Sequence, residues 1–263
     1  MILFNFDRND IRLTLNLIRM NVRDRYLGSS LGSFWAITNP LFMLAVYTYV
    51  FGFILKVKLP GAESTFAYVI WLISGYGPWI ATVEAIVAAT ASVVGASGLV
   101  KNMAFKTELL PISAAFIGLI SLTVSLLFLL TLMTIAGNVP DWHIVWIPLI
   151  IILQLFFIVA LGLWLSVINV FVRDLSIALP NILTIIMFIT PIFYPISTMP
   201  QVIRILSLGN PFYQISDAYR NVLLEQITPN YWGMGYVFLL SVVIFHFGLI
   251  AFRRAKSHFD AAL

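Results

Sequence analysis

Long stretches without any charged side chain dominate this sequence. Glu84 alone interrupts the stretch 64–100. Aspartate, glutamate, lysine and arginine are absent from five further stretches, namely 26–55, 109–140, 142–172, 175–203 and 226–252. Each stretch is long enough for a transmembrane helix, which needs roughly 20 mostly apolar residues. The sequence therefore predicts an all-α integral membrane protein. Its six expected spans cover about 34–55, 66–93, 111–136, 144–170, 177–195 and 231–252.

The composition agrees with burial in a lipid bilayer. Hydrophobic residues make up 61% of the chain and charged residues 10%, and the mean hydropathy is +0.99. Soluble domains carry about one quarter charged residues, so this chain has too few polar groups to cover a water-exposed surface. We expect a single transmembrane domain over 1–263. Charged residues at 7–12 stand where a signal peptide has its apolar core, so we expect insertion through the internal helices.

The basic residues are distributed unevenly between the two sides of this arrangement. With six spans, both termini share a side. That side carries eleven of the 15 lysines and arginines, and the opposite side carries Lys56, Lys58, Arg204 and Arg220. Because cytoplasmic segments are enriched in lysine and arginine, we predict that both termini are cytoplasmic. The net charge of +4 is modest and gathers at membrane edges, so we expect no nucleic-acid partner.

Residues 7–25 have the pattern of an amphipathic helix. Ile11, Leu15, Ile18 and Val22 recur on one face, and the arginines recur on another. A helix of this kind lies in the lipid headgroup region, with its apolar face down and its cations toward anionic lipid. The alternative is a solvated basic segment that only obeys the charge rule for cytoplasmic regions.

Two connecting segments also carry helical signals. Between the second and third spans, 98–110 is bounded by Gly98 and Pro111, and it predicts a short cytoplasmic helix or, alternatively, a plain loop. Between the fifth and sixth spans, 200–226 predicts two short amphipathic helices separated at Gly209-Asn210, which re-enter the membrane or lie at its outer surface.

No motif for catalysis, metal binding or nucleotide binding is visible. The glycine-rich stretches 28–32 and 95–101 lack the Gly-Lys-Ser/Thr ending of a phosphate loop. His143, His246 and His258 are scattered, and the chain has no cysteine. We therefore expect no catalytic residue, no metal and no cofactor on this chain. An integral membrane enzyme acting on polyprenyl-linked sugars stays open as an alternative, as does a secondary-transport flippase.

The first two spans hold the candidate residues of a translocation path. Glu84 is the one acid deep in an apolar stretch. It either makes a polar contact along the translocation path, or it only sits near an interface or pairs with a neighbour. Aromatic rings with polar tips can stack on sugar faces, or they can form an interfacial belt. The rings that gather in the outer halves of these spans are Tyr47, Tyr49, Trp71, Tyr76 and Trp79.

Several short motifs follow one another in a characteristic order. They are Tyr26-Leu27-Gly28-Ser29-Ser30-Leu31-Gly32, Trp35, Asn39-Pro40, the segment 101–111, Arg173-Asp174, the segment 191–195, Asn210-Pro211 and the basic tail 252–263. In this order, in its length and in its six-span layout, the chain resembles the permease subunits of ABC type-2 exporters. The resemblance is to the polysaccharide branch and is closest to O-antigen permeases. Lys106 stands where proline is frequent in that family.

This resemblance implies a homodimer with two separate ATPase subunits, which would hold ATP and magnesium, in a bacterial inner membrane. The substrate would be a polysaccharide on polyprenyl pyrophosphate, carried through a pore between two copies; O-antigen is expected, with teichoic acid or capsule as alternatives. The path candidates above, Glu84 included, would line that pore. ATPase contacts would include the N-terminal helix and Lys101, Asn102, Met103, Phe105, Lys106 and Glu108. The pyrophosphate would meet Arg12, Arg19, Arg23 and Arg25. A periplasmic gate would include Arg204, Asn210, Pro211 and Tyr219.

Overall fold

The computed structural model describes residues 7–25, 31–32, 34–60, 64–102 and 105–262. Within these ranges the chain forms helices and turns without any β-strand, which confirms the predicted all-α fold. The helices are α1 Arg8–Asp24, α2 Phe34–Tyr47, the π-helix η1 Thr48–Ile54, α3 Thr65–Gly95, α4 Ser97–Asn102, α5 Leu109–Ala115, α6 Gly118–Ile135, η2 Trp142–Trp146, α7 Ile147–Phe171, α8 Asp174–Ile189, η3 Ile196–Thr198, α9 Gln201–Leu208, α10 Pro211–Leu223, α11 Tyr231–Ala255, η4 Lys256–His258 and α12 Phe259–Ala262.

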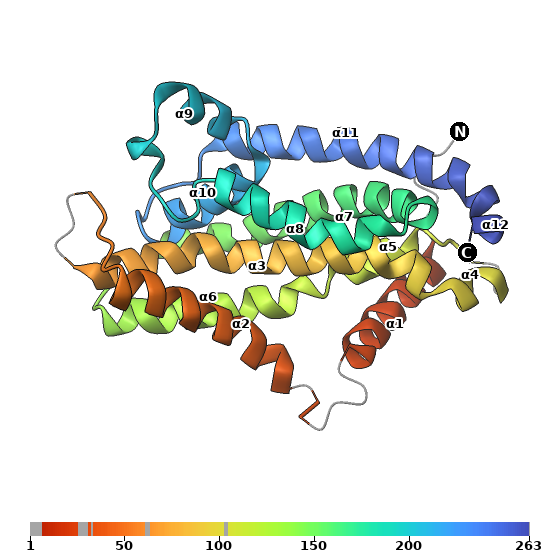
Figure 1. Ribbon diagram of the computed structural model, residues 1–263, viewed down its shortest axis with the longest axis horizontal. Coiled ribbons are helices and arrows are strands. Elements are labelled where there is room, and N and C mark those ends of the chain that lie inside the picture. Colours follow the sequence, from red (N-terminus) through yellow and green to blue (C-terminus); the bar gives the residue numbers. More distant parts are fainter. Residues whose placement is uncertain (1–6, 26–30, 33, 61–63, 103–104, 263) are drawn as a thin grey trace.

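The helices form an elongated bundle. Figure 1 shows α3, α7, α8 and α11 running roughly along its long axis, with α4 and α12 at one end and α9 protruding at the opposite end. Among the described residues, five helical stretches are long and apolar enough to cross a membrane: Phe34–Ile54, Thr65–Gly95, Leu109–Ile135, Trp142–Phe171 and Tyr231–His258. The chain is therefore a multi-pass membrane protein.

The fifth predicted span, 177–195, ends earlier than expected. The corresponding helix α8 has 16 residues and stops at Ile189. Thr190 adopts an extended conformation with ψ of 136°. This break has a local cause, because the ring of Pro191 disfavours helical geometry in the residue before it. Helix α8 is thus about 24 Å long, which is shorter than the roughly 30 Å hydrocarbon core of a bilayer.

Helix α3 forms the centre of the bundle and approaches its neighbours closely. At Gly118 of α6, an added Cβ would lie 2.3 Å from the Ala81 carbonyl oxygen of α3. At Gly162 of α7, it would lie 2.7 Å from the Cβ of Ala89. Small residues of this kind allow membrane helices to pack backbone against backbone. A second, smaller core joins α1, α5, α11 and α12 through Leu17, Leu109, Phe252 and Phe259.

Two predicted segments differ from the structure. The single helix predicted over 98–110 is corrected to two pieces, because α4 ends at Asn102 and the next helix, α5, begins at Leu109. The second of the two amphipathic helices predicted over 200–226 corresponds to α10. In the structure α10 is buried on both sides, so that Gln214, Arg220 and Asn221 are buried along with Ile215 and Val222.

Candidate coupling and translocation sites

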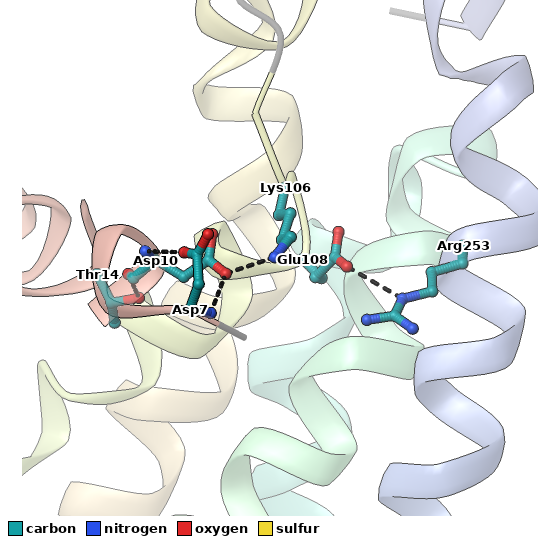
Figure 2. A network of polar contacts seen from close by, with 6 residues as sticks. All are labelled: Asp7, Asp10, Thr14, Lys106, Glu108 and Arg253. Carbon is teal, nitrogen blue, oxygen red and sulfur yellow. Dashed lines mark hydrogen bonds and ion pairs between the residues drawn. The ribbon is translucent and has the colours of Figure 1, made fainter. Parts of the chain in front are cut away.

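The segment 105–110 is tied to the N-terminal helix by an ion pair. Lys106 Nζ lies 2.5 Å from Asp10 Oδ2 (Figure 2). Asp10 is held in place by the capping box of α1, in which its backbone N–H donates to Asp7 Oδ1 and its carboxylate accepts from the Asp7 N–H. The hydrogen bond from Lys106 is the main cause that lowers the pKa of the Asp10 carboxyl below its ordinary value. The Asp10 carboxylate therefore stays charged at neutral pH.

The same segment also contacts α11 and the short helix η4 that follows it. Arg253 Nε of α11 donates to Glu108 Oε1 at 3.1 Å, as Figure 2 shows. Lys256 Nζ donates to the Phe105 carbonyl oxygen at 2.8 Å. Glu108 is buried, so loss of this partner would cost more stability than it would for an exposed carboxylate. A displacement of 105–110 would therefore move or strain its contacts with both α1 and α11.

The predicted ATPase-contact residues are not equally available to a partner. Lys101 on α4 is exposed, whereas Phe105 and Lys106 are half-buried and Glu108 is buried. Met103 lies outside the described residues, and the side chain of Asn102 is not described. The sequence missed the roles of Asp10, Arg253 and Lys256 as internal partners of this segment, since they are far from it along the chain.

The predicted arginines lie on α1 and at its C-terminal end. Arg12, Arg19 and Arg23 are exposed. Arg25 lines a cavity of about 580 Å³ between α1, the end of α3, α4 and α5. Apart from Arg25, Asp24 and Asn21, its walls are mostly small and apolar residues of α3, α4 and α5, including Ala91, Ser92, Gly95, Ala96 and Gly98. The structure thus places one of the four predicted arginines at a hollow beside the α4 end of the bundle.

Glu84 has partners within its own chain. Arg25 Nη2 lies 3.3 Å from Glu84 Oε1, and the hydroxyl of Ser121 on α6 donates to the other carboxylate oxygen. The side chain of Glu84 is largely buried, at 14% exposed. Of the two interpretations of this residue, pairing with a neighbour is the one that the structure shows, and the neighbour is one of the predicted pyrophosphate arginines.

The five candidate aromatic rings do not share one surface. Tyr76 and Trp79 are buried in the core of the single chain, whereas Tyr49 is exposed. Tyr47 packs against Tyr76 and Phe193, with ring centroids 4.4 and 5.2 Å apart. Phe193, which the sequence analysis did not select, is the ring around which this cluster forms. Pore lining therefore stays a prediction for this set, and Tyr76 and Trp79 present almost no free surface in this structure.

The predicted gate residues have defined roles near α9 and α10. Asn210 and Pro211 form the start of α10, where the Asn210 side chain caps the helix by accepting from the Phe212 N–H at 2.9 Å. Tyr219 is fully buried and donates to Gln154 Oε1 at 2.7 Å. Arg204 on the exposed helix α9 donates to the Ser197 carbonyl oxygen at 3.0 Å.

A buried arginine in the same region was missed. Arg220 was counted among the external cations, yet it lies inside the bundle and touches α3 and the turn after α8. No spacing in the sequence distinguishes it from an exposed arginine. Among the described residues, no group of three histidine or acidic side chains is placed to hold a metal ion.

The fold and these sites define a class of protein, a multi-pass helical bundle with a charged segment held between α1 and α11. Residues 12–224 match the ABC-2 type transporter family. The chain therefore belongs to this family, which confirms the resemblance found in the sequence. It is 28% identical to the O-antigen export system permease protein RfbA of Myxococcus xanthus and 23% identical to the protein of the same name of Klebsiella pneumoniae. Each similarity covers 95% of both chains.

Proposed function

We propose that this chain is the transmembrane subunit of an ATP-driven exporter of a polysaccharide carried on polyprenyl pyrophosphate, with O-antigen as the glycan. The observation that carries the proposal is the similarity to O-antigen export permeases over 95% of both chains. Matches of this extent span nearly the whole chain rather than one motif. Teichoic acid and capsule permeases are the alternatives within the same branch.

The energy for transport is proposed to come from two separate ATPase subunits that hold ATP and magnesium. The sequence of this chain contains no phosphate-loop motif, which supports ATP hydrolysis on another chain. The docking surface is proposed at α4 and 105–110, where Lys101 is exposed. Movement of this segment would pass to α1 through Lys106 and Asp10 and to α11 through Glu108 and Arg253.

The polysaccharide is proposed to cross between two copies of this chain in the inner membrane, with both termini in the cytoplasm. In this topology α8, extended by the turn 190–195, forms the fifth of the six spans, and α11 forms the last. The eleven-to-four distribution of basic residues supports the orientation. The pyrophosphate would approach along α1, and at the cavity it would compete with Glu84 for Arg25, which favours anionic ligands through its guanidinium.

Copurification and transport test this proposal together. We expect the tagged chain to bring down an ABC-type ATPase, and we expect its deletion to remove the polysaccharide from the cell surface while the lipid-linked form accumulates inside. A partner ATPase that binds but does not hydrolyse ATP serves as the matched control and should give the same accumulation. Movement of the lipid-linked substrate in liposomes containing this chain alone, without nucleotide, would contradict the proposal. Chemical conversion of that substrate would instead support the enzyme alternative.

A further inference from the structure

Arg220 of α10 is a fully buried cation in a membrane domain. Such a residue is costly, because its charge is removed from water. Its guanidinium lies 3.8 Å from the ring centroid of Trp71 on α3, in a cation–π contact. Nη1 donates to the Pro191 carbonyl oxygen at 2.9 Å, and Nη2 donates to the Ile192 carbonyl oxygen at 2.8 Å. Two of its nitrogens are thus committed to the backbone directly after α8.

That backbone needs an external partner. A helix leaves its last carbonyl groups without intrahelical donors, and its C-terminal end carries a partial negative charge. The Pro191 and Ile192 carbonyl groups lie just beyond this end, and as buried backbone groups outside a helix they too need donors. The Arg220 guanidinium supplies two donors and a positive charge close to this end. It therefore satisfies, from another helix, two carbonyl groups of the turn directly after α8.

Helix α3 is shaped to receive the same guanidinium. A Cβ added at Gly75 would lie 2.3 Å from Arg220 Nη2 and 2.9 Å from Cζ. Gly75 and Trp71 are four residues apart, so they share one face of α3. Trp71 provides the ring and Gly75 provides the space beside it. Arg220 therefore contacts α3 and the end of α8 at once.

Further hydrogen bonds strengthen the junction formed by α3, α10 and the turn after α8. Asn210 Nδ2 donates to Thr190 Oγ1 at 2.8 Å, and the Tyr68 hydroxyl donates to the Phe193 carbonyl oxygen at 2.8 Å. The contact between Asn210 and Thr190 brings together the two ends of the segment 191–209, which carries η3 and the exposed helix α9 (Figure 1). The contact of Tyr68 joins the start of this segment to α3. Release of the junction would free the turn after α8 from both α3 and α10.

We infer that Arg220 is a positioning residue for transport, which locks the outer ends of α3, α8 and α10 together and keeps the outer end of the path closed until these helices separate. This inference rests on the proposed export function. Lysine cannot take the same role, because its single ammonium group cannot place two donors in the fixed fork of a guanidinium.

Cysteine labelling measures the state of this junction directly, since the chain contains no native cysteine. Ser74 is fully buried beside Gly75, and Ser74→Cys is a nearly isosteric reporter. In cells treated with a water-soluble maleimide, we expect the single variant Ser74→Cys to be labelled slowly. Adding Arg220→Met should raise the labelling rate about tenfold or more, because charge-assisted hydrogen bonds are lost. Surface polysaccharide should fall severalfold at equal amounts of the chain in the membrane.

Matched variants separate the junction from general damage. With Arg220→Lys, Ser74→Cys should be labelled as fast as with Arg220→Met. Gly75→Ala should also raise the labelling rate and lower export with Arg220 still present, because the new methyl group displaces the guanidinium. Lys58→Met removes an exposed cation, and Gly235→Ala adds a methyl group with no atom within 4 Å; both should behave as the unaltered chain. If Arg220→Met does not accumulate in membranes, Gly75→Ala carries the same comparison.

The outcomes distinguish this inference from the proposed function. Normal labelling and normal export in both Arg220→Met and Gly75→Ala would overturn the inference and leave the proposed function standing. Raised labelling with reduced export would support both. If the unaltered chain supports no polysaccharide export at all, the proposed function fails, and the role of Arg220 in transport fails with it.

Discussion

Glu108 illustrates how much a single carboxylate in this protein depends on one distant partner. It is buried, and Arg253 reaches it from a helix 145 residues further along the chain. We predict that Glu108→Gln and Arg253→Gln each destabilise the protein, and that the double variant is less destabilised than the sum. A double-mutant cycle by thermal unfolding in detergent should give a coupling of about 1–2 kcal/mol, since Arg253 is partly exposed and solvent screens the pair. Additive effects would show that the pair is not coupled.

Asp10 gives a pH-dependent prediction at the same scale. The pKa of its carboxyl is lowered by the hydrogen bond from Lys106, so the folded state favours the charged form. The resulting stabilisation is fully present above the ordinary pKa of 3.8 and is lost as the pH falls through the lower pKa of the folded state. Thermal unfolding between about pH 6 and pH 3 should therefore show a smaller loss of stability on acidification in Asp10→Asn than in the unaltered chain. Parallel curves for the two proteins would contradict this assignment.

At the scale of the helices, the close approach of α3 and α6 is the contact most sensitive to added volume. Gly118→Ala would place a methyl group 2.3 Å from a backbone oxygen, which cannot move aside as a flexible side chain can. We predict a destabilisation of about 1–3 kcal/mol by thermal unfolding, as is typical of overpacked cores. Gly95→Ala, with no atom within 4 Å of the added methyl group, is the control and should be neutral. Equal effects of the two variants would indicate that helix propensity, and not packing, decides.

For the whole molecule, the number of spans decides where the two ends of the chain lie. With six spans both ends face the cytoplasm, whereas with five they face opposite sides. Single cysteines can report this, because the natural chain has none. We predict that an impermeant maleimide labels Lys58→Cys in intact cells but leaves Arg8→Cys and Arg254→Cys unlabelled until the membrane is opened. Labelling of only one of the two terminal positions from outside would mean that α8 does not cross the membrane.

The sequence predicted the long helices more accurately than the ends of helices and the sites. The long helices were found because apolar character accumulates residue by residue along the chain. The end of α8 was misplaced because the apolar stretch continues past Ile189, and only the conformation imposed by Pro191 ends the helix there. The single helix expected over 98–110 failed for a similar reason, since charge and length do not indicate where a short helix breaks.

The sequence by itself determined that this chain lives in a membrane, that it is helical, and which family it resembles, because these properties depend on local composition and on the order of motifs. Only the tertiary structure decided which polar groups meet inside the bundle. Glu84 and Ser121 are 37 residues apart, and Arg220 and Ile192 are 28 apart. The partners of such groups depend on how the helices pack. The identity of a charged residue does not indicate whether its side chain is buried or exposed. In this fold the charge-free stretches position the helices, and the few charges between and within them join the helices together.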